Sequence, residues 1–209
     1  MYKKLDQNAL NEILETGIEE FAKHGLDRAN INTIAKKAGV SVGVLYKYYK
    51  DKDDFFLSCV KHSLKLLDET MEEALKDCDD VATGIRMIVR GLIASGKKHG
   101  NYYVMYNEIT SGSCQKYAKE LAREIEGKTA YLYKELLEKA GQEGKVKGMA
   151  NPGMFAFYFD NLLMMLQFSY SCDYYKERMK IYCGEDILKN ENLVEDSFIE
   201  FMSRALGIE

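Results

Sequence analysis

Hydrophobic residues recur every three or four positions along most of the chain, with charged residues between them. This spacing places the apolar side chains on one face of a helix and predicts amphipathic α-helices. The predicted helices of the first third are residues 10–25, 31–38, 42–49 and 51–76. Asn30, Ser41 and Asp51 are placed to cap the second, third and fourth of them. The order is therefore helix, short helix, tight turn, short helix and long helix.

The same pattern continues through the rest of the chain. The further predicted helices are residues 81–98, 102–110, 113–140, 152–171, 174–182 and 185–206. The segment Gly141 to Ala150 has three glycines and predicts the longest loop. Asn151 and Pro152 then supply an N-cap and a first-turn proline, so the only proline of the chain starts a helix.

Composition supports an all-α protein of ordinary globular type. One proline and no tryptophan occur among 209 residues, of which 46% are hydrophobic and 30% charged. No secretory signal is visible at the N-terminus, and the most apolar stretch carries Asp160, so neither export nor a membrane partner is expected. Five widely spaced cysteines predict neither a disulfide framework nor a zinc site. The three histidines lack metal-ligand spacing as well. We expect a cytoplasmic protein without metal or cofactor.

Residues 30–52 contain the most informative pattern, two short helices joined through Ala38-Gly39-Val40-Ser41. In a helix-turn-helix unit the second helix enters the major groove of DNA while the first lies across the backbone. Residues 23–52 hold seven basic side chains against two acidic ones, a local charge of +5, whereas the whole chain carries −4. A basic segment within an acidic chain indicates a DNA-binding head on an acidic body.

The head resembles the TetR family of transcriptional regulators over about residues 8–57. The matching positions are Phe21, Gly25, Ile34-Ala35, Ala38-Gly39-Val40-Ser41, Gly43, Leu45-Tyr46-Lys47-Tyr48-Tyr49 and Lys52. Asn30 and Tyr49 depart from the family pattern, where Thr and Phe are commoner. The resemblance implies a head at residues 1–50 and a helical regulatory domain at residues 51–209.

The resemblance also implies a mode of action. We expect a repressor that binds a palindromic operator in double-stranded DNA as a homodimer, built from the helices at 152–171 and 185–206. A small apolar or amphipathic effector would enter the regulatory domain and release the DNA. A constitutive DNA-binding dimer without ligand is the alternative within the same class.

Candidate DNA contacts lie in and around the two short helices. Val42 and Val44 can touch thymine methyl groups, and Gly43 lets the backbone approach a base. Leu45 and Ile34 are expected in the core. The full set of candidates is Asn30, Asn32, Ser41, Val42, Gly43, Val44, Tyr46, Lys47, Tyr48 and Lys52.

Two short segments of the sequence match all or most of an enzyme motif. Residues 39–43 spell G-x-S-x-G, so a hydrolase using Ser41 is a second class of function, but that motif requires a β-strand before the serine. Residues 91–97 spell most of a nucleotide-binding P-loop, but Lys98 replaces the Ser or Thr that would hold magnesium. Capping explains Ser41 fully, and we expect the chain not to be an enzyme.

Aromatic and methionine side chains are concentrated at residues 151–175 and 102–106. Such side chains line adaptable apolar pockets, although most must belong to the core or a dimer interface. The candidate ligand contacts are Tyr103, Tyr106, Asn161, Met164 and Phe168. Asp160, Asn161 and Gln167 are polar residues on an otherwise apolar helix. They face solvent, a dimer partner or a ligand, and the sequence leaves these alternatives open.

Overall fold

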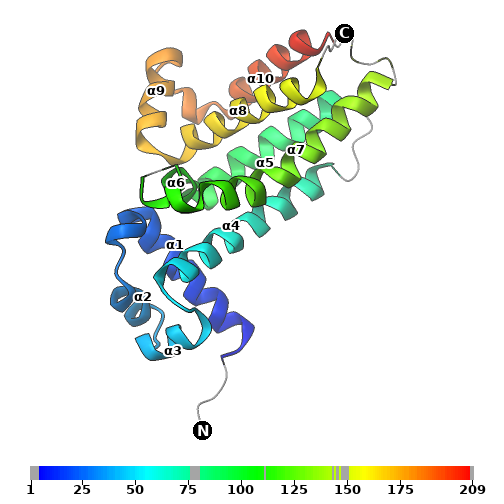
Figure 1. Ribbon diagram of the computed structural model, residues 1–209. Helices are drawn as coiled ribbons and strands as arrows, with labels where there is room; N and C mark the ends of the chain where they lie inside the picture. The colour runs from blue at the N-terminus through cyan, green and yellow to red at the C-terminus, as the bar shows by residue number, and fades with distance from the viewer. Residues whose placement is uncertain are drawn as a thin grey trace. The chain divides into compact units, whose positions relative to one another are not determined.

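The computed structural model describes residues 5–75, 81–110, 112–142, 144, 146 and 151–207. Within these ranges every regular element is helical, which confirms the all-α fold (Figure 1). The chain divides into two compact units. The first unit comprises Met1–Leu66 and Asn101–Ala118, and the second comprises Leu67–Gly100 and Lys119–Glu209. The first unit thus continues past residue 50 and includes a segment from the middle of the chain.

The first unit contains the three-helix head. Its elements are α1 (Gln7–Arg28), α2 (Ile31–Lys37), α3 (Val42–Tyr48), the beginning of α4 (Lys52–Leu75), nearly all of α6 (Gly100–Glu108) and the 3₁₀-helix η1 (Gly112–Tyr117). The expected core residues Ile34 and Leu45 have no exposed surface. Phe21 of α1 packs edge-on against Phe56 of α4, with ring centroids 5.1 Å apart. Apolar packing therefore fixes the two short helices against α1 and α4.

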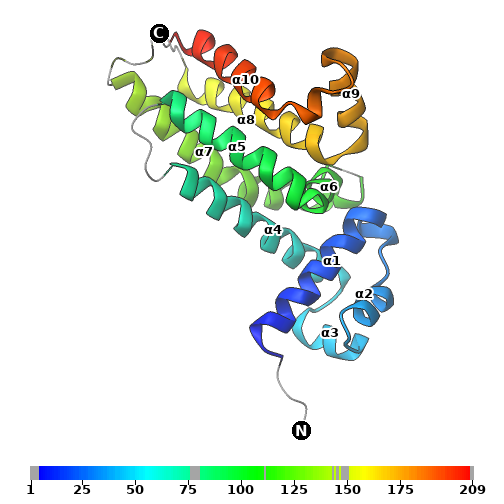
Figure 2. The ribbon, with the colours of Figure 1, turned by 180° about the vertical axis from the view of Figure 1, so that it is seen from behind.

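The second unit is a bundle of longer helices. Its elements are the remainder of α4, α5 (Val81–Lys98), α7 (Ala118–Gln142), α8 (Pro152–Ser171), α9 (Asp173–Cys183), the 3₁₀-helix η2 (Ile187–Lys189) and α10 (Glu191–Leu206). Its core includes Ile88 and Leu92 of α5 and Leu163 of α8. Figures 1 and 2 both show α8 and α10 side by side. Pro152 begins α8 and Asn151 caps it, as predicted.

Several predicted boundaries differ from the structure, three of them in ways that change the element. Gly25 has φ 69° and interrupts α1, but one further turn continues to Arg28. The predicted helix at 113–140 is a 3₁₀-helix followed by α7. The predicted start of the last helix at 185 is wrong, because η2 intervenes and Asn190 caps α10. Lys76, Cys78 and most of the predicted loop 141–150 lie outside the described residues.

No helix among the described residues is both long enough and apolar enough to cross a membrane. Cys59, Cys114 and Cys172 are buried and Cys183 is exposed, and these four are free thiols. In the same part of the chain no group of His, Cys, Asp and Glu is arranged to hold a metal ion.

Candidate nucleic-acid interface

The turn between α2 and α3 depends on Gly39. Its φ of +68° lies in the left-handed region, which a residue without a Cβ adopts at little cost. The Gly39 amide donates to the Lys36 carbonyl at 3.3 Å, and the Val40 amide donates to the Ala35 carbonyl at 2.9 Å. These two bonds form a Schellman motif that ends α2 and lets α3 start at once. The G-x-S-x-G stretch is therefore a helix-to-helix turn, and the strand that a nucleophile elbow requires is absent before Ser41.

Side-chain caps fix the first turns of both short helices. The Asn30 side-chain oxygen accepts from the Asn32 amide at 2.9 Å, and Ser41 Oγ accepts from the Val44 amide at 3.2 Å. Each cap satisfies a backbone donor that has no partner inside its helix. Asn30 and Ser41 thus have structural roles whether or not they also touch DNA.

The exposed residues of α3 are those that the sequence assigns to DNA. Gly43, Tyr46 and Lys47 are exposed, whereas Leu45 is fully buried and Val44 is half-buried. A Cβ at Gly43 would meet only Ser41 Oγ, at 3.9 Å. The backbone of α3 is thus open to close approach at this position, as the prediction requires. Val42 is half-buried, and Asn32 of α2 is exposed.

Two predicted phosphate contacts also make hydrogen bonds within the head. The Tyr48 hydroxyl accepts from the Leu5 amide at 2.8 Å, so it holds the beginning of the described chain against the end of α3. The Lys52 ammonium donates to the Asp27 carbonyl at 2.7 Å and links the start of α4 to the end of α1. Both groups keep further hydrogen-bonding capacity for DNA.

Glu20 is a structural residue of the head that sequence reasoning missed. The residue is 4% exposed, and its carboxylate accepts from the Asn30 amide at 3.2 Å. The Lys37 ammonium lies 3.8 Å from the same carboxylate and His24 lies 3.9 Å from it. Glu20 therefore joins α1 to both ends of α2. The sequence signal is weak, because Glu20 stands beside Phe21 on a helix with several other glutamates.

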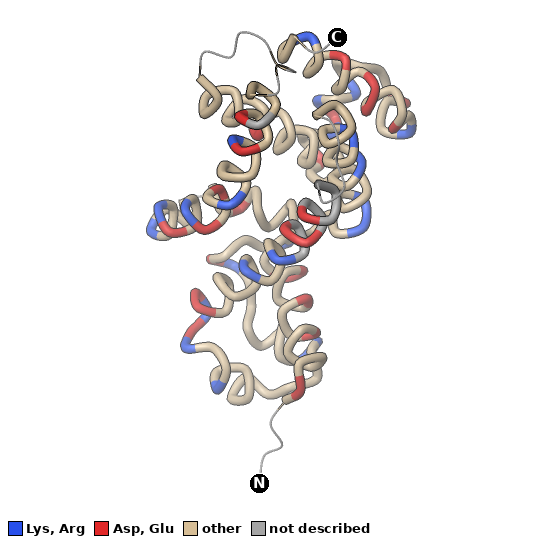
Figure 3. Tube along the Cα trace, turned by 90° about the vertical axis from the view of Figure 1, so that its right-hand side faces the viewer, with Lys and Arg blue, Asp and Glu red and all other residues tan. Residues whose placement is uncertain are grey.

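Figure 3 marks the basic residues in blue and the acidic residues in red along the Cα trace. Lys36, Lys47 and Lys50 are exposed on or beside the two short helices. In the second unit, Arg86 and Arg90 of α5 are paired with Glu195 of α10 at 2.5 and 2.6 Å. Arg90 and Arg86 hold the pKa of Glu195 below its usual range despite the burial of that carboxyl.

The five candidate ligand contacts are divided between the units. Tyr103 is buried and Tyr106 half-buried in the first unit, while Asn161, Met164 and Phe168 lie on α8 in the second. The Asn161 amide donates to the Phe157 carbonyl of its own helix at 2.6 Å. Phe168 is buried against Tyr175 of α9, with ring centroids 5.3 Å apart.

The second unit also contains an apolar crevice. The space between its walls is too narrow to admit a water molecule. The residues that line it are Ile85 of α5, Tyr133, Leu136 and Leu137 of α7, Phe155 and Phe159 of α8, and Met202 and Leu206 of α10. None of the five candidate ligand contacts is among them.

The stretch that imitates a P-loop is part of a continuous helix. Residues 91–97 lie within α5, and the Lys97 ammonium pairs with Glu191 at the start of α10. A phosphate-binding loop would instead follow a strand and present free backbone amides. The alternative of a nucleotide-binding protein using Lys97 is therefore wrong.

Comparison with known proteins gives a match in the head and a likeness of the whole fold. Residues 13–59 match the model of the bacterial regulatory proteins of the tetR family. The "Fatty acid metabolism regulator protein" of Bacillus subtilis is 35% identical over 66 residues, which cover 32% of this chain and 34% of that protein. The aligned region thus spans about a third of the relative's length.

Solved structures extend the likeness to almost the whole chain, at low sequence identity. The fatty acid degradation regulator FadR of Bacillus halodurans superposes with a TM-score of 0.71 at 17% identity, covering 93% of this chain and 95% of its own. FadR of Bacillus subtilis in complex with stearoyl-CoA gives 0.72 at 18% identity, covering 91% and 97%. These named relatives are regulators rather than enzymes, in agreement with the expectation from the sequence.

Proposed function

We propose that this chain, whose residues 13–59 match the model of the bacterial regulatory proteins of the tetR family, is a transcriptional repressor that binds a palindromic operator as a homodimer. The observation that carries this proposal is the α2–α3 unit, in which a Schellman turn and two side-chain caps present an exposed α3. A dimer presents two such helices, so its operator mirrors the two-fold symmetry of the protein.

A glycine substitution tests α3 as the recognition helix. Gly43→Ala adds one methyl group to an open position inside a helix, which should raise the helix propensity by about 0.5–1 kcal/mol. The same methyl group would obstruct close approach of a base, so affinity for DNA should fall. The assay is fluorescence anisotropy with DNA that the wild-type protein selects from a random pool. Improved stability together with unchanged affinity would contradict the assignment.

The control for Gly43 is Gly127→Ala. Gly127 is also an exposed helical glycine with open space around its missing Cβ, but it lies on α7. The Gly127→Ala variant should gain similar stability and leave DNA binding unchanged.

A lysine pair gives a second test of α3. Lys47→Ala in α3 should weaken DNA binding. Lys98→Ala, at the end of α5, removes the same charge outside the head and should leave DNA binding unchanged.

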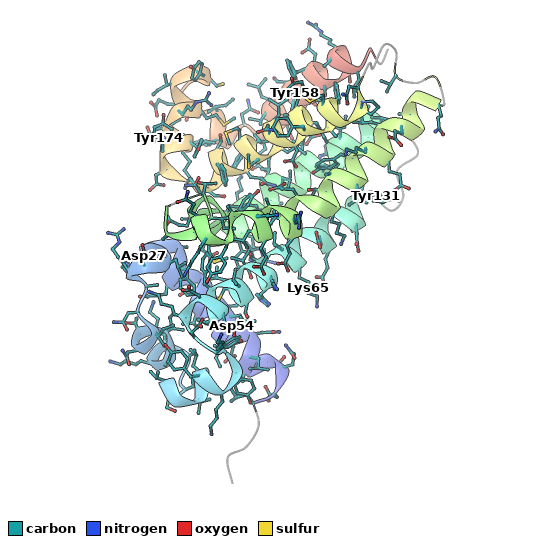
Figure 4. All side chains as sticks on the ribbon, viewed as in Figure 1. Asp27, Asp54, Lys65, Tyr131, Tyr158 and Tyr174 are labelled. Carbon is teal, nitrogen blue, oxygen red and sulfur yellow. The ribbon has the colours of Figure 1, made fainter. Side chains whose placement is uncertain are left out.

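The proposed homodimer rests on an exposed apolar face of α8 and α10. Phe157 and Tyr158 of α8 are 59% and 58% exposed, and Phe201 of α10 is 57% exposed. Tyr158 is labelled on α8 in Figure 4. Large apolar patches are uncommon on monomers and mark association surfaces. Phe157→Ser combined with Phe201→Ser should give a monomer in sedimentation velocity, whereas Tyr131→Ser, at an exposed position of α7, should leave the dimer intact.

We propose that the effector is an amphipathic molecule with an acyl chain. Two observations support this class: an entirely apolar crevice in the second unit, and relatives named as fatty acid regulators, one of them in complex with stearoyl-CoA. A ligand that weakens operator binding about 100-fold needs about 2.7 kcal/mol of coupling between the two sites. Stearoyl-CoA, stearate and coenzyme A should be titrated separately into the protein–DNA complex. Release by either acyl compound but not by coenzyme A alone is expected.

The narrowness of the crevice favours a second candidate, a constitutive DNA-binding dimer without effector. In that case none of the three compounds would release DNA or raise the melting temperature. The two candidates share the head and the dimer, and differ only in the response to ligand.

A further inference from the structure

The first turn of α4 makes hydrogen bonds to several segments of the first unit. The Asp51 carboxylate accepts from the Asp54 amide at 2.8 Å and caps α4 itself. Lys52 donates to the Asp27 carbonyl at the end of α1. The Asp54 carboxylate accepts from the Lys50 amide at 2.8 Å, just after α3. Asp27 and Asp54 are labelled in Figure 4. This turn, residues 51–54, is therefore hydrogen-bonded both to the end of α1 and to Lys50, just after α3.

Asp53 joins this turn to η1. Its carboxylate accepts from the Lys116 ammonium and from the Tyr117 hydroxyl, the latter at 2.6 Å, although both donors lie more than sixty residues later in the chain. Lys116 and Tyr117 hold the pKa of Asp53 below its usual range. The Lys116 ammonium also lies 4.9 Å from the centre of the Tyr117 ring. Two donors from one short helix thus converge on a single carboxylate oxygen.

The connection from Asp53 to α3 is short and rigid. Tyr49, the C-cap residue that follows α3, is buried with its ring centroid 4.7 Å from that of Phe55, two residues after Asp53. The Phe55 amide donates to the Asp51 carbonyl at 3.1 Å. A displacement of the first turn of α4 is therefore transmitted to the end of α3, because packed side chains and backbone hydrogen bonds leave little room for independent movement.

We infer that η1 positions the recognition helix through the contact of Lys116 and Tyr117 with Asp53, which makes Asp53 a positioning residue for DNA binding. The inference rests on the proposed function of α3. The helices that bear on DNA would then include a segment from the middle of the chain, in agreement with the inclusion of residues 101–118 in the first unit.

The rival view is that this contact is an ordinary surface ion pair. Such pairs contribute little to stability because water screens them, and the Asp53 and Lys116 side chains are 30% and 58% exposed. The two views make opposite predictions for the DNA affinity of the Asp53→Asn variant. If Asp53 and Lys116 affected DNA binding only through the attraction or repulsion between their charges and the phosphates, Asp53→Asn would strengthen binding by removing a negative charge. Lys116→Met would then weaken binding by removing a positive charge. If the contact positions α3, both substitutions weaken binding.

The test measures operator affinity for Asp53→Asn, Lys116→Met and Tyr117→Phe by anisotropy, at a temperature well below the melting transition of each variant. All three should raise Kd about tenfold, since each breaks a hydrogen bond to a charged partner. Tyr117→Phe changes no charge at neutral pH and so isolates the hydrogen bond. The double variant of Asp53→Asn with Tyr117→Phe should lose no more than Asp53→Asn alone.

Two control variants separate positioning from charge and from general destabilisation. Asp27→Asn removes an exposed carboxylate from the same unit and should leave Kd unchanged or slightly lower. Lys116→Arg keeps a donor and should retain most of the affinity. Tighter binding by Asp53→Asn, or wild-type affinity in Tyr117→Phe, would overturn the inference.

Amide hydrogen exchange in the DNA-free protein provides a readout that does not depend on the proposed function. Tyr117→Phe should accelerate exchange of the amides from Leu45 to Asp54 by about threefold or more, whereas Tyr131→Phe on α7 should not. Unchanged exchange at these amides would refute the positioning role. Faster exchange in a protein that selects no DNA would instead refute the proposed function and leave the positioning role supported.

Discussion

Asp160 of α8 makes the stability of the second unit depend on pH. Burial and, to a smaller extent, the nearby Glu126 carboxylate raise its pKa from 3.8 to about 6. Between these two values the folded protein holds a proton that the unfolded chain has released, so the free energy of unfolding decreases as the pH rises through this window. The difference between 3.8 and about 6 corresponds to about 3 kcal/mol lost by pH 7.

Replacing Asp160 by Asn removes the charge and keeps the shape of the side chain. Asp160→Asn should therefore raise the free energy of unfolding at pH 7 by about 2–3 kcal/mol and change it little at pH 4. The assay is urea denaturation followed by circular dichroism between pH 4 and 7.5, at one protein concentration because a dimer's stability depends on concentration. Glu138→Gln, at an exposed position of α7, is the control for loss of a charge.

Two results would show that the reasoning about Asp160 is wrong. One is an equal effect of Asp160→Asn at pH 4 and pH 7, which would mean that ionisation is not the cause. The other is a loss of stability at pH 7, which would mean that the carboxylate has a favourable partner in the assembled protein. The second result would also favour a dimer or ligand contact over burial within one chain.

Three further substitutions test the head by urea denaturation. Ser41→Ala removes the cap of α3 and should lower the free energy of unfolding by about 1 kcal/mol. Gly17→Ala would place a Cβ 2.5 Å from the ring of Phe55 and should cost about 1–3 kcal/mol through overpacking. Glu20→Ala leaves the Asn30 amide without its acceptor and should cost about 1–3 kcal/mol. A change below about 0.5 kcal/mol in any of them would contradict the corresponding contact.

Local signals were sufficient to predict the elements of the head. Asn30 and Ser41 were predicted as caps from their positions before apolar periodic segments, and both cap as expected. Gly39 was predicted to end α2, and its positive φ explains why a glycine stands there. These features depend on residues within one or two turns of each other, which is the range over which sequence patterns carry information.

The features that the sequence did not predict depend on contacts between distant residues or on a short 3₁₀-helix. The start of α10 was placed six residues early, because no proline or glycine marks the break between the short 3₁₀-helix and α10. The pairing of Asp53 with Lys116 joins residues more than sixty positions apart, and neither residue stands in a recognisable motif. Such contacts follow from tertiary packing, which overrides local pattern.

The charge of the head shows how structure changes a count made from sequence. Seven basic residues between positions 23 and 52, against two acidic ones, predicted a segment that attracts phosphate. Lys52 donates to the Asp27 carbonyl, and Lys37 lies 3.8 Å from the buried Glu20 carboxylate, so both already stabilise the fold. The Asp27 carbonyl is neutral and Lys52 keeps further donors, so of these two lysines only Lys37 has its charge offset, by the Glu20 carboxylate. Because each neutralised phosphate adds about 0.9 to the slope of log K against log salt, at most six such contacts in each of two heads give a slope no steeper than about −11.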